Sequence, residues 1–354
     1  MKSKECNDFL LRTKDKKLLK FYHKEKIGII CCEFINNKIV NKKILAKGCL
    51  KYFYIFEDNN TNINLIYQDL TGKIILCHLS EGNVNFKTIF YTKTNFITPI
   101  NIKAISLIDN SFIFYTLDSD PTKVYFRNNI SSESVIIYKE KSDIDINYKI
   151  LHDKENISLI ILSTSFNMFK IIFKTYNLKN KKWDNHRIIF ISRRSYIDSS
   201  FCLVDTKIHS LFIINEEGKK SLIYKYNSLE KDQYTQREFI IYEDENLSSC
   251  LIIEMKNIVY LLWISKNKLY SCYSLNFGES FSKPLICIDS LKDCIRKIDF
   301  IDNGELKEIY LGEKLGEITL FLEKIIKHND SFHINHKEIT YKPKDKKEVL
   351  QLKI

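Results

Sequence analysis

The sequence predicts an all-β fold, a seven-bladed β-propeller of four-stranded antiparallel blades, with a six-bladed ring as the alternative if an end unit is misassigned. The main observation is a motif that recurs seven times at a spacing of about 48 residues, because repeats of about 40–50 residues with four short strands are typical of propellers. The second observation is length, since seven such units use nearly all of the 354 residues. The third is a 44% apolar content rich in residues that suit half-buried strands.

The clearest copy of the motif runs from Ile63 to Leu76 and reads as an apolar strand, a short polar turn and a second apolar strand. Aligning the other copies on Tyr67 gives one equivalent position in each unit. We expect all seven positions to lie on the second strand of their unit: Tyr22, Tyr67, Tyr115, Ile161, Ile213, Trp263 and Leu311.

Each unit divides into four apolar runs, ordered from the axis outward, that are bounded by turn residues at hairpin spacing. In the second unit the runs are Leu50 to Phe56, Ile63 to Gln68, Lys73 to Leu79 and Phe86 to Tyr91. The inner runs are more continuously apolar, as expected of strands buried on both faces. The outer runs carry more Lys and Glu, as expected at an exposed edge.

The same division sets the expected boundaries of a single propeller domain over residues 1–342. The units fall near 7–47, 48–93, 97–140, 145–194, 196–243, 247–290 and 294–342. We expect the ring to close by side-chain packing between complete first and last blades, with no strand exchanged. The C-terminal tail, 343–354, is then dispensable, although its alternating apolar residues also fit a last strand. Leu322 to Ile326 is the one candidate helical turn.

Charge and cysteine usage narrow the class of protein. The net charge is +11, but 55 basic residues are scattered among 44 acidic ones without the basic stripe of nucleic-acid binders, so nucleic acid is an unlikely partner. No apolar run is long enough to span a membrane. Most of the ten cysteines lie in apolar runs, and the adjacent Cys31 and Cys32 should have side chains that face opposite ways. No signal peptide precedes them, so we expect a cytoplasmic monomer with no disulfide.

One segment resembles a known family motif. Ser274-Leu275-Asn276-Phe277-Gly278-Glu279-Ser280-Phe281 is similar to the Asp-box, the bacterial neuraminidase repeat, with Asn276 in place of Asp and Ser280 in place of Thr. It falls in the turn between the third and fourth runs of the sixth unit, where that family carries it. The resemblance implies a sialidase-like propeller fold in which Asn276 bonds the turn backbone, Gly278 takes positive φ and Phe281 packs between strands.

Sialidase activity does not follow from this resemblance. Sialidases resemble one another in three arginines that clamp a carboxylate, an Arg-Ile-Pro segment and a Tyr/Glu nucleophile pair, and lysine replaces those arginines poorly. This chain has seven arginines and no Arg-Ile-Pro: Arg12, Arg127, Arg187, Arg193, Arg194, Arg237 and Arg296. We therefore predict no catalytic residue by this route.

The sequence has no clear pattern of metal-binding or cofactor-binding residues, and we predict neither a metal nor a cofactor. His333 and His336 are spaced so that their imidazoles would face opposite sides of a strand. The acidic pairs at 118 and 120 and at 143 and 145 do not continue into a calcium-loop pattern. No phosphate-binding loop or catalytic signature occurs.

One turn is the best candidate for ligand binding. Propellers usually bind ligands on the face that carries the turns between the second and third runs and between successive units. One such turn holds the only adjacent pair of arginines in the sequence, Arg193 and Arg194. An aromatic residue, Tyr196, lies beside the pair, and Asp198 is close by. We expect this group to bind an acidic or sugar ligand.

These observations favour non-catalytic binding, first as a protein-interaction scaffold. One alternative is a single-site, lectin-like carbohydrate binder, because the units share too little for repeated sugar pockets. The other is a glycosidase or lyase whose carboxylates no motif reveals. A pair of carboxyl groups about 5–10 Å apart in the channel would favour the enzyme, and a broad apolar or charged patch would favour the scaffold.

Overall fold

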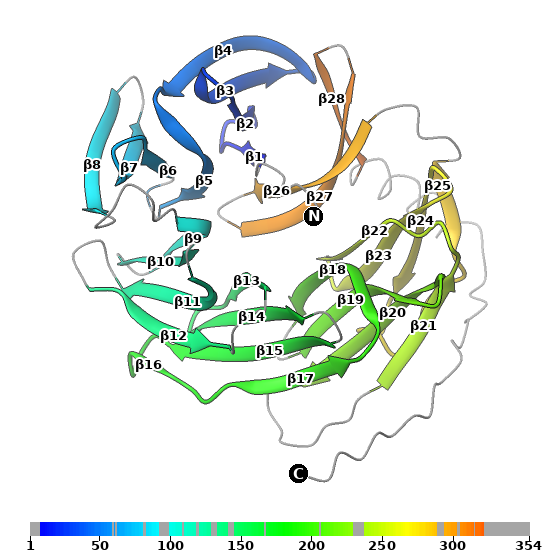
Figure 1. Cartoon of the computed structure of the whole chain (residues 1–354). Coiled ribbons are helices and arrows are strands. Elements are labelled where there is room, and N and C mark those ends of the chain that lie inside the picture. The colour runs from blue at the N-terminus through cyan, green and yellow to red at the C-terminus, as the bar shows by residue number, and fades with distance from the viewer. Residues whose placement is uncertain are drawn as a thin grey trace.

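The computed structural model describes residues 8–321 apart from short segments. The segments outside the description are 59, 61, 81–82, 92–98, 108–109, 118–119, 129–132, 141–144, 166–167, 205–206, 229–236, 289–293, 303–304 and 315. Every element in the described part is a β-strand, and the strands form consecutive antiparallel groups around a common centre (Figure 1). The predicted all-β propeller fold is confirmed. Among the described residues, no helix has the length and apolar character needed to cross a membrane.

Five groups form separate sheets whose strands follow one another in sequence. They are β5(Cys49–Glu57), β6(Ile63–Asp69), β7(Lys73–Ser80) and β8(Asn83–Tyr91); β9(Pro99–Leu107), β10(Asn110–Leu117), β11(Asp120–Asn128) and β12(Val135–Lys139); β13(Asp145–His152), β14(Asn156–Ser165), β15(Met168–Asn177), β16(Lys182–Trp183) and β17(Arg187–Ser192); β18(Ser195–Val204), β19(Lys207–Glu216), β20(Lys219–Ser228) and β21(Arg237–Glu243); and β22(Ser249–Met255), β23(Ile258–Ser265), β24(Lys268–Ser274) and β25(Leu285–Ile288). We call these groups the second to the sixth units.

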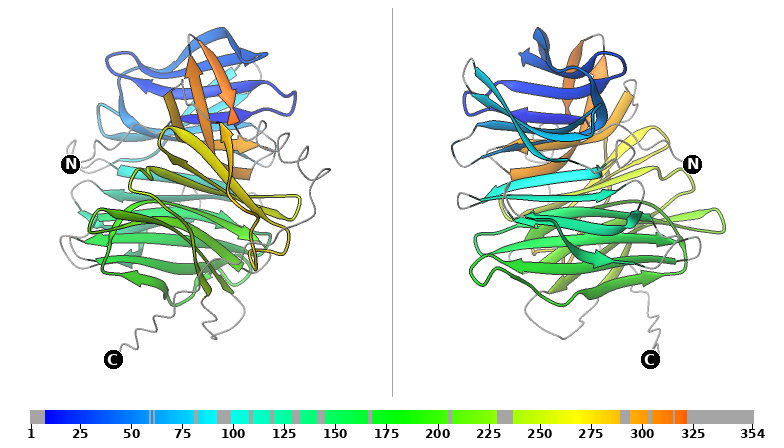
Figure 2. Two further views of the ribbon diagram at one scale, coloured as in Figure 1. Left: turned by 90° about the vertical axis from the view of Figure 1, so that its right-hand side faces the viewer. Right: turned by 60° about the vertical axis from the view of Figure 1, so that its left-hand side comes forward.

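The first and last units share one closed sheet of seven strands. The first unit is β1(Phe9–Arg12), β2(Leu18–Lys24), β3(Gly28–Ile35) and β4(Lys38–Ala46), and the last is β26(Cys294–Asp302), β27(Glu305–Lys314) and β28(Glu317–Leu320). β1 pairs in parallel with β26 from Phe9↔Asp299 to Arg12↔Asp302, and β28 meets β4 at Glu317↔Lys38. Figure 2 shows the two units, blue and orange, side by side at one end of the molecule.

This closure corrects the expectation that side-chain packing alone joins the first and last blades. Backbone groups at an unpaired strand edge need partners, and here two inner strands supply them to each other directly. The ladder therefore merges seven strand groups into six sheets. The predicted helical turn and the 343–354 tail lie outside the described residues.

The seven aligned positions all fall on the second strand of their unit. Tyr22 lies on β2, Tyr67 on β6, Tyr115 on β10, Ile161 on β14, Ile213 on β19, Trp263 on β23 and Leu311 on β27. Each is buried except Tyr22, which is half-buried. The repeat in the sequence therefore marks structurally equivalent strands, although the single-domain boundaries themselves stay a prediction.

The core lies between the sheets as successive apolar clusters. One cluster joins the fifth and sixth units around Tyr224, Trp263 and Phe281, and another fills the inside of the closed sheet around Ile298 and Leu311. Eight cysteines of the described part are free thiols. Cys31 packs against the cluster of the first three units and Cys32 belongs to the cluster inside the closed sheet, so the two face opposite ways as expected.

Candidate functional site

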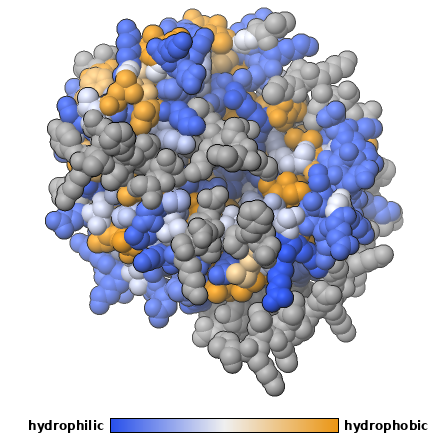
Figure 3. Space-filling model, viewed as in Figure 1, coloured by the Kyte–Doolittle hydropathy of each residue, from blue (hydrophilic) through white to orange (hydrophobic). Residues whose placement is uncertain are grey.

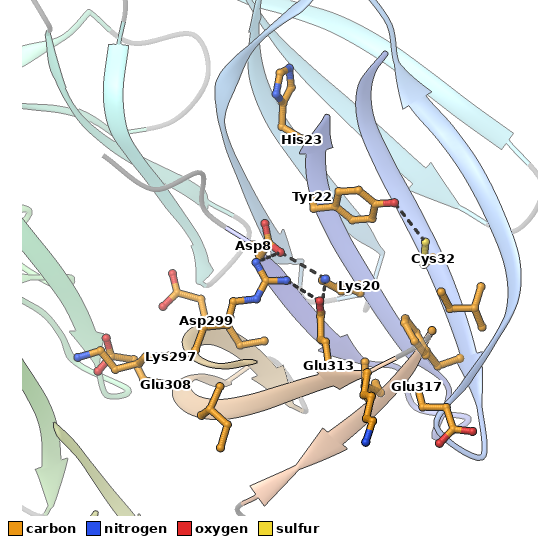
Figure 4. A pocket seen from close by; sticks show the side chains of 18 of the residues that line it. Asp8, Lys20, Tyr22, His23, Cys32, Lys297, Asp299, Glu308, Glu313 and Glu317 are labelled. Carbon is orange, nitrogen blue, oxygen red and sulfur yellow. Dashed lines mark hydrogen bonds and ion pairs between the residues drawn. The ribbon is translucent and has the colours of Figure 1, made fainter. Parts of the chain in front are cut away.

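A cavity of about 1110 Å³ opens beside the axis of the ring and extends into the mouth of the closed sheet. Its walls come from the first, third, fourth and last units, through β2, β9, β13, β26 and β27. Hydrophilic residues border the middle of the face viewed in Figure 3. Figure 4 shows acidic and basic side chains reaching into the space from facing strands. Most of the polar lining therefore comes from the inner strands, which the sequence suggested would be apolar.

At the mouth of the closed sheet, four charged residues neutralise one another. We call them the mouth quartet: Asp8, Lys20, Arg296 and Glu313. Arg296 pairs with Asp8 at 2.7 Å and with Glu313 at 2.8 Å, and Lys20 contacts both carboxylates, lying 3.4 Å from Asp8. Burial raises the pKa of Asp8 against the opposing effect of the two cations. Every charge of the mouth quartet has a partner, so this end of the cavity is a saturated ionic contact between the first and last units.

Nearer the axis, four charged residues from different units form a second group, the axial network: Lys149, Asp198, Lys297 and Glu308. Lys297 Nζ lies 2.6 Å from Asp198 Oδ1 and donates to two backbone carbonyls. Lys149 Nζ lies 2.5 Å from Glu308 Oε1, and the hydroxyl of Ser200 donates to Glu308 Oε2 at 2.7 Å. Because these residues lie on β13, β18, β26 and β27, the network ties the fourth, fifth and last units together at the axis.

Two charged residues on the inner strands, Asp299 and Lys103, belong to neither network. Both line the cavity, and within the described part of the chain neither side chain has a hydrogen bond or an ion pair. Asp299 lies directly opposite Glu308 in the β26–β27 ladder, so both carboxyl groups project from the same face of the sheet. The cavity therefore holds one engaged and one free carboxyl group side by side.

The environments of these two carboxyl groups push their pKa values apart. Burial raises the pKa of Asp299 despite the nearby cation Lys103. Burial also opposes ionisation of Glu308, but the charges of Lys149 and Lys297 outweigh it and lower its pKa to about 2. Glu308 is thus a carboxylate at neutral pH, whereas Asp299 holds a proton more readily than an ordinary aspartate.

The structure does not gather Arg193, Arg194, Tyr196 and Asp198 into one ligand site. Arg193 is exposed in the turn between units, and Arg194 pairs with Glu216 at 3.1 Å. Tyr196 stacks on Phe169 of the fourth unit with ring centroids 4.5 Å apart, whereas Asp198 accepts hydrogen bonds from the sixth unit.

A bulge explains this divergence. The β18–β19 register shifts between Tyr196 and Asp198, leaving Ile197 as the extra residue. A β-bulge re-aims the side chains on either side of it. Asp198 consequently enters the axial network through Lys297, which lines the cavity, but none of the four predicted ligand residues lines the cavity itself.

The Asp-box-like residues do come together, in the turn between β24 and β25. Ser280 N donates to Asn276 Oδ1 at 3.0 Å, and Gly278 N donates to Ser274 Oγ at 2.8 Å. Gly278 has φ +86°, and Phe281 is buried. These are the roles that the resemblance implies.

The turn also docks on the fifth unit. Phe281 packs edge-on against Tyr224, with ring centroids 4.7 Å apart, and Tyr226 Oη donates to Glu279 at 2.8 Å. None of these residues lines the cavity. The turn therefore connects two units and lies away from the candidate site.

The residues weighed as metal ligands give no site. In the part of the chain that the structure describes, no group of three or more His, Cys, Asp or Glu is arranged to hold a metal ion. Asp120 instead interacts with Thr122 and Lys123. Asp118, Asp143, His333 and His336 lie outside the described residues, as does the side chain of Asp145.

Sequence reasoning missed the residues that line the axis because no motif contains them. One signal was available: charged residues that interrupt otherwise apolar first strands. Lys103 lies in Asn-Ile-Lys-Ala-Ile, Lys149 in Tyr-Lys-Ile-Leu, and Lys297 and Asp299 in Arg-Lys-Ile-Asp-Phe. A charge at a buried strand position needs a partner, so these positions marked the charged lining of the axis in advance.

Comparison with known proteins supports the fold. No family model matches the sequence, and no curated protein matches it. Among solved structures, a polysaccharide lyase of family PL25, an ulvan lyase bound to a GlcA–Rha3S saccharide, aligns with a TM-score of 0.58 at 10% identity, over 87% of this chain and 89% of that one. The polysaccharide lyase Uly1 gives 0.56 at 9% identity, over 89% and 88%.

A more distant match is a six-bladed fungal lectin from Aleuria aurantia. It aligns with a TM-score of 0.42 at 10% identity, over 77% of this chain and 92% of that one. At identities of 9–10%, the likeness to the two polysaccharide lyases concerns the fold alone, and the chemistry of this chain has to be argued from its own residues.

Proposed function

We propose that this protein is a carbohydrate-binding propeller with a single site, the axial cavity. The observation that carries the proposal is the free polar surface of that cavity: Lys103 and Asp299 line it and have no partner in the described chain. Buried or half-buried polar groups without partners are costly unless a ligand or water satisfies them. A polyhydroxylated ligand supplies both donors and acceptors to such groups.

The composition of the rest of the lining fits the same ligand class. Asn147 is exposed at the cavity, and Tyr22 presents a half-buried ring at its outer end. Concave sites with a few convergent polar groups and an aromatic surface are typical of small-molecule binding. The two solved propellers with TM-scores above 0.5 described above are polysaccharide lyases, which makes saccharides the first class to test.

The protein-scaffold interpretation is less well supported. It required a broad apolar or charged patch, but on the face viewed in Figure 3 apolar residues form small groups separated by hydrophilic ones. The largest run of exposed apolar side chains in the described chain, Ile35, Ile39, Val40 and Ile44, lies along β3 and β4 between lysines. Lysines on an outer strand are a common protection against edge pairing.

A glycan array of neutral, uronic-acid and sulfated oligosaccharides tests the proposal. The wild-type protein is expected to bind a defined subset, and Lys103→Met is expected to weaken binding by about tenfold, the loss of roughly one charged hydrogen bond. Lys154→Met, in an exposed turn outside the cavity, is the matched control and should bind as wild type does. Binding to no glycan, or equal binding by Lys103→Met, would place the function elsewhere.

A further inference from the structure

Apart from Glu317, which pairs with the exposed Lys38, the carboxyl groups that line the cavity are of two kinds. Asp8 and Glu313 of the mouth quartet are held between two cations each. Asp299 and Glu308 form the second kind, a pair on adjacent strands in which only one member has partners. The first kind serves the contact between the first and last units. The second has no such structural explanation, because a half-buried carboxyl group without a hydrogen bond or an ion pair adds nothing to stability.

The geometry of this pair is fixed by the β26–β27 ladder. Asp299 and Glu308 are direct cross-strand partners, and such partners have Cβ atoms about 4.5–5.5 Å apart on one face of the sheet. Both residues line the cavity. In a retaining glycosidase two carboxyl groups about 5–5.5 Å apart flank one bond of the bound sugar, one as acid and base and the other as nucleophile. Cross-strand neighbours on one face of a sheet have Cβ atoms close enough for their carboxyl groups to adopt that separation.

The neighbours of the pair assign a role to each member. Lys149 and Ser200 contact the two oxygens of Glu308, and the charge of Lys297 acts on it as well. These three residues keep Glu308 ionised, and the two contacts to its oxygens fix its rotamer. Asp299 faces Lys103, Lys149, Lys297 and Glu308 without bonding to any of them, and burial raises its pKa. Two carboxyl groups whose pKa values differ in this way are suited to act as a protonated acid and an ionised partner.

We propose that the cavity hydrolyses a glycosidic bond of the saccharide it binds, with Asp299 as general acid–base and Glu308 as nucleophile. In the first step a Glu308 oxygen bonds to the anomeric carbon while the bond from that carbon to the leaving oxygen breaks, and Asp299 gives its proton to that oxygen. In the second step water gives a proton to Asp299, its oxygen bonds to the anomeric carbon, and the ester to Glu308 breaks. One water is consumed and both carboxyl groups are restored.

This inference rests on the proposed function, because hydrolysis needs a bound saccharide. The experiment below distinguishes failure of the hydrolysis from failure of the binding. The glycans that the array identifies are incubated with the protein in ¹⁸O-labelled water and analysed by mass spectrometry. Wild type is expected to release shorter saccharides that carry one ¹⁸O at the new reducing end. A bound glycan recovered intact would overturn the hydrolysis while leaving binding in place. Binding to no glycan would overturn both.

Two variants and a control assign the roles. Asp299→Asn removes a carboxyl group that has no ion pair and keeps a polar side chain of the same size, so the protein should fold as wild type does. Its turnover at saturating glycan is expected to fall by at least about 100-fold. Glu308→Gln should abolish turnover to a similar or larger extent. Glu155→Gln changes an exposed carboxylate outside the cavity and should leave turnover unchanged. Hydrolysis by Asp299→Asn at the wild-type rate would show that this pair is not catalytic.

Discussion

Two boundaries between neighbouring units are built in opposite ways. The first and last units meet through the main chain, because β1 pairs with β26 and β4 with β28. The fifth and sixth units meet through side chains, because the Asp-box-like turn places Phe281 and Gly278 against Tyr224. We call these the first–last seam and the fifth–sixth seam.

The difference shows where a propeller leaves room for a site. At the fifth–sixth seam, aromatic rings in contact with one another fill the space between the sheets. At the first–last seam, backbone hydrogen bonds hold the two units together at their inner edge, and the mouth quartet adds ion pairs between them. The charged cavity lies along this seam, so the position of the site follows from how the ring is closed.

The largest expected effect comes from breaking the main-chain seam. Leu11 is fully buried on β1 and lies between Leu19 on β2 and Ile301 on β26. Leu11→Ala should lower the free energy of unfolding by about 2–5 kcal/mol through the cavity it leaves. Leu11→Pro should cost about 3 kcal/mol more, because proline also removes a ladder hydrogen bond. Urea denaturation measures both, and equal losses would show that the backbone pairing of β1 does not hold the ring closed.

The side-chain seam should respond to a single methyl group. A Cβ at Gly278 would lie 1.7 Å from Tyr224 Oη at φ +86°, whereas Gly218 has φ +87° and nothing within 4 Å of such a Cβ. Gly218→Ala should therefore cost about 1 kcal/mol through backbone strain alone. Gly278→Ala should cost about 2–4 kcal/mol, because overpacking adds to the strain. Thermal unfolding of the two variants measures both losses of stability. Similar losses would mean that the Tyr224 side chain moves away from the added methyl group at little cost.

The fifth–sixth seam should also carry a pH dependence. His209 is fully buried, its Nδ1 lies 2.6 Å from Tyr224 Oη, and its ring stacks near Tyr226. Burial, reinforced by Lys207, lowers the pKa of His209 to about 4. His209 therefore takes up a proton below about pH 6.5 in the unfolded chain but only below about pH 4 in the folded chain. The free energy of unfolding consequently falls as the pH falls from about 6.5 to about 4.

The size of this effect follows from the two pKa values. Between pH 7 and pH 5 the contribution of His209 to the free energy of unfolding should fall by about 2 kcal/mol. His209→Gln does not titrate, so its stability should change by about 2 kcal/mol less over the same interval in urea denaturation. A variant with the same pH dependence as wild type would assign the titration to another group.

The smallest effect is expected at Arg194, which belongs to neither seam. Its ion pair with Glu216 is largely at the surface, and such pairs contribute below about 1 kcal/mol. Arg194→Ala should leave both stability and glycan binding close to wild type, and Arg193→Ala should do the same. A marked loss of binding in either variant would move the ligand site from the cavity to the turn between the fourth and fifth units.

The fold was predictable because its signals are local. Periodic apolar runs and turn residues locate strands without knowledge of their partners, so Tyr67 and its six equivalents fell on second strands. The turn at Ser274 to Phe281 is likewise shaped locally, because the hydrogen bonds that Ser274 and Asn276 accept come from residues four positions along the chain. Such features need no information about the rest of the ring.

The site was not predictable because it depends on register and on long-range pairing. The bulge at Ile197 redirects Asp198, and no glycine or proline next to it in the sequence indicates a bulge there. The opposition of Asp299 and Glu308 requires the exact pairing of β26 with β27. The parallel ladder of β1 with β26 joins residues as far apart as Arg12 and Asp302, which also form an ion pair. The charges were visible in the sequence, but their neighbours were not.

The parallel ladder also links ligand binding to the opening of the ring. One wall of the cavity belongs to β2 and another to β26 and β27, so a molecule that touches both walls binds the closed ring and not the open one. Such a ligand raises the free energy of unfolding by RT ln(1 + [L]/Kd), about 2.7 kcal/mol at a free concentration one hundred times Kd. Occupancy would thus protect β1 and β26 from hydrogen exchange before it protected the sheets on the far side of the ring.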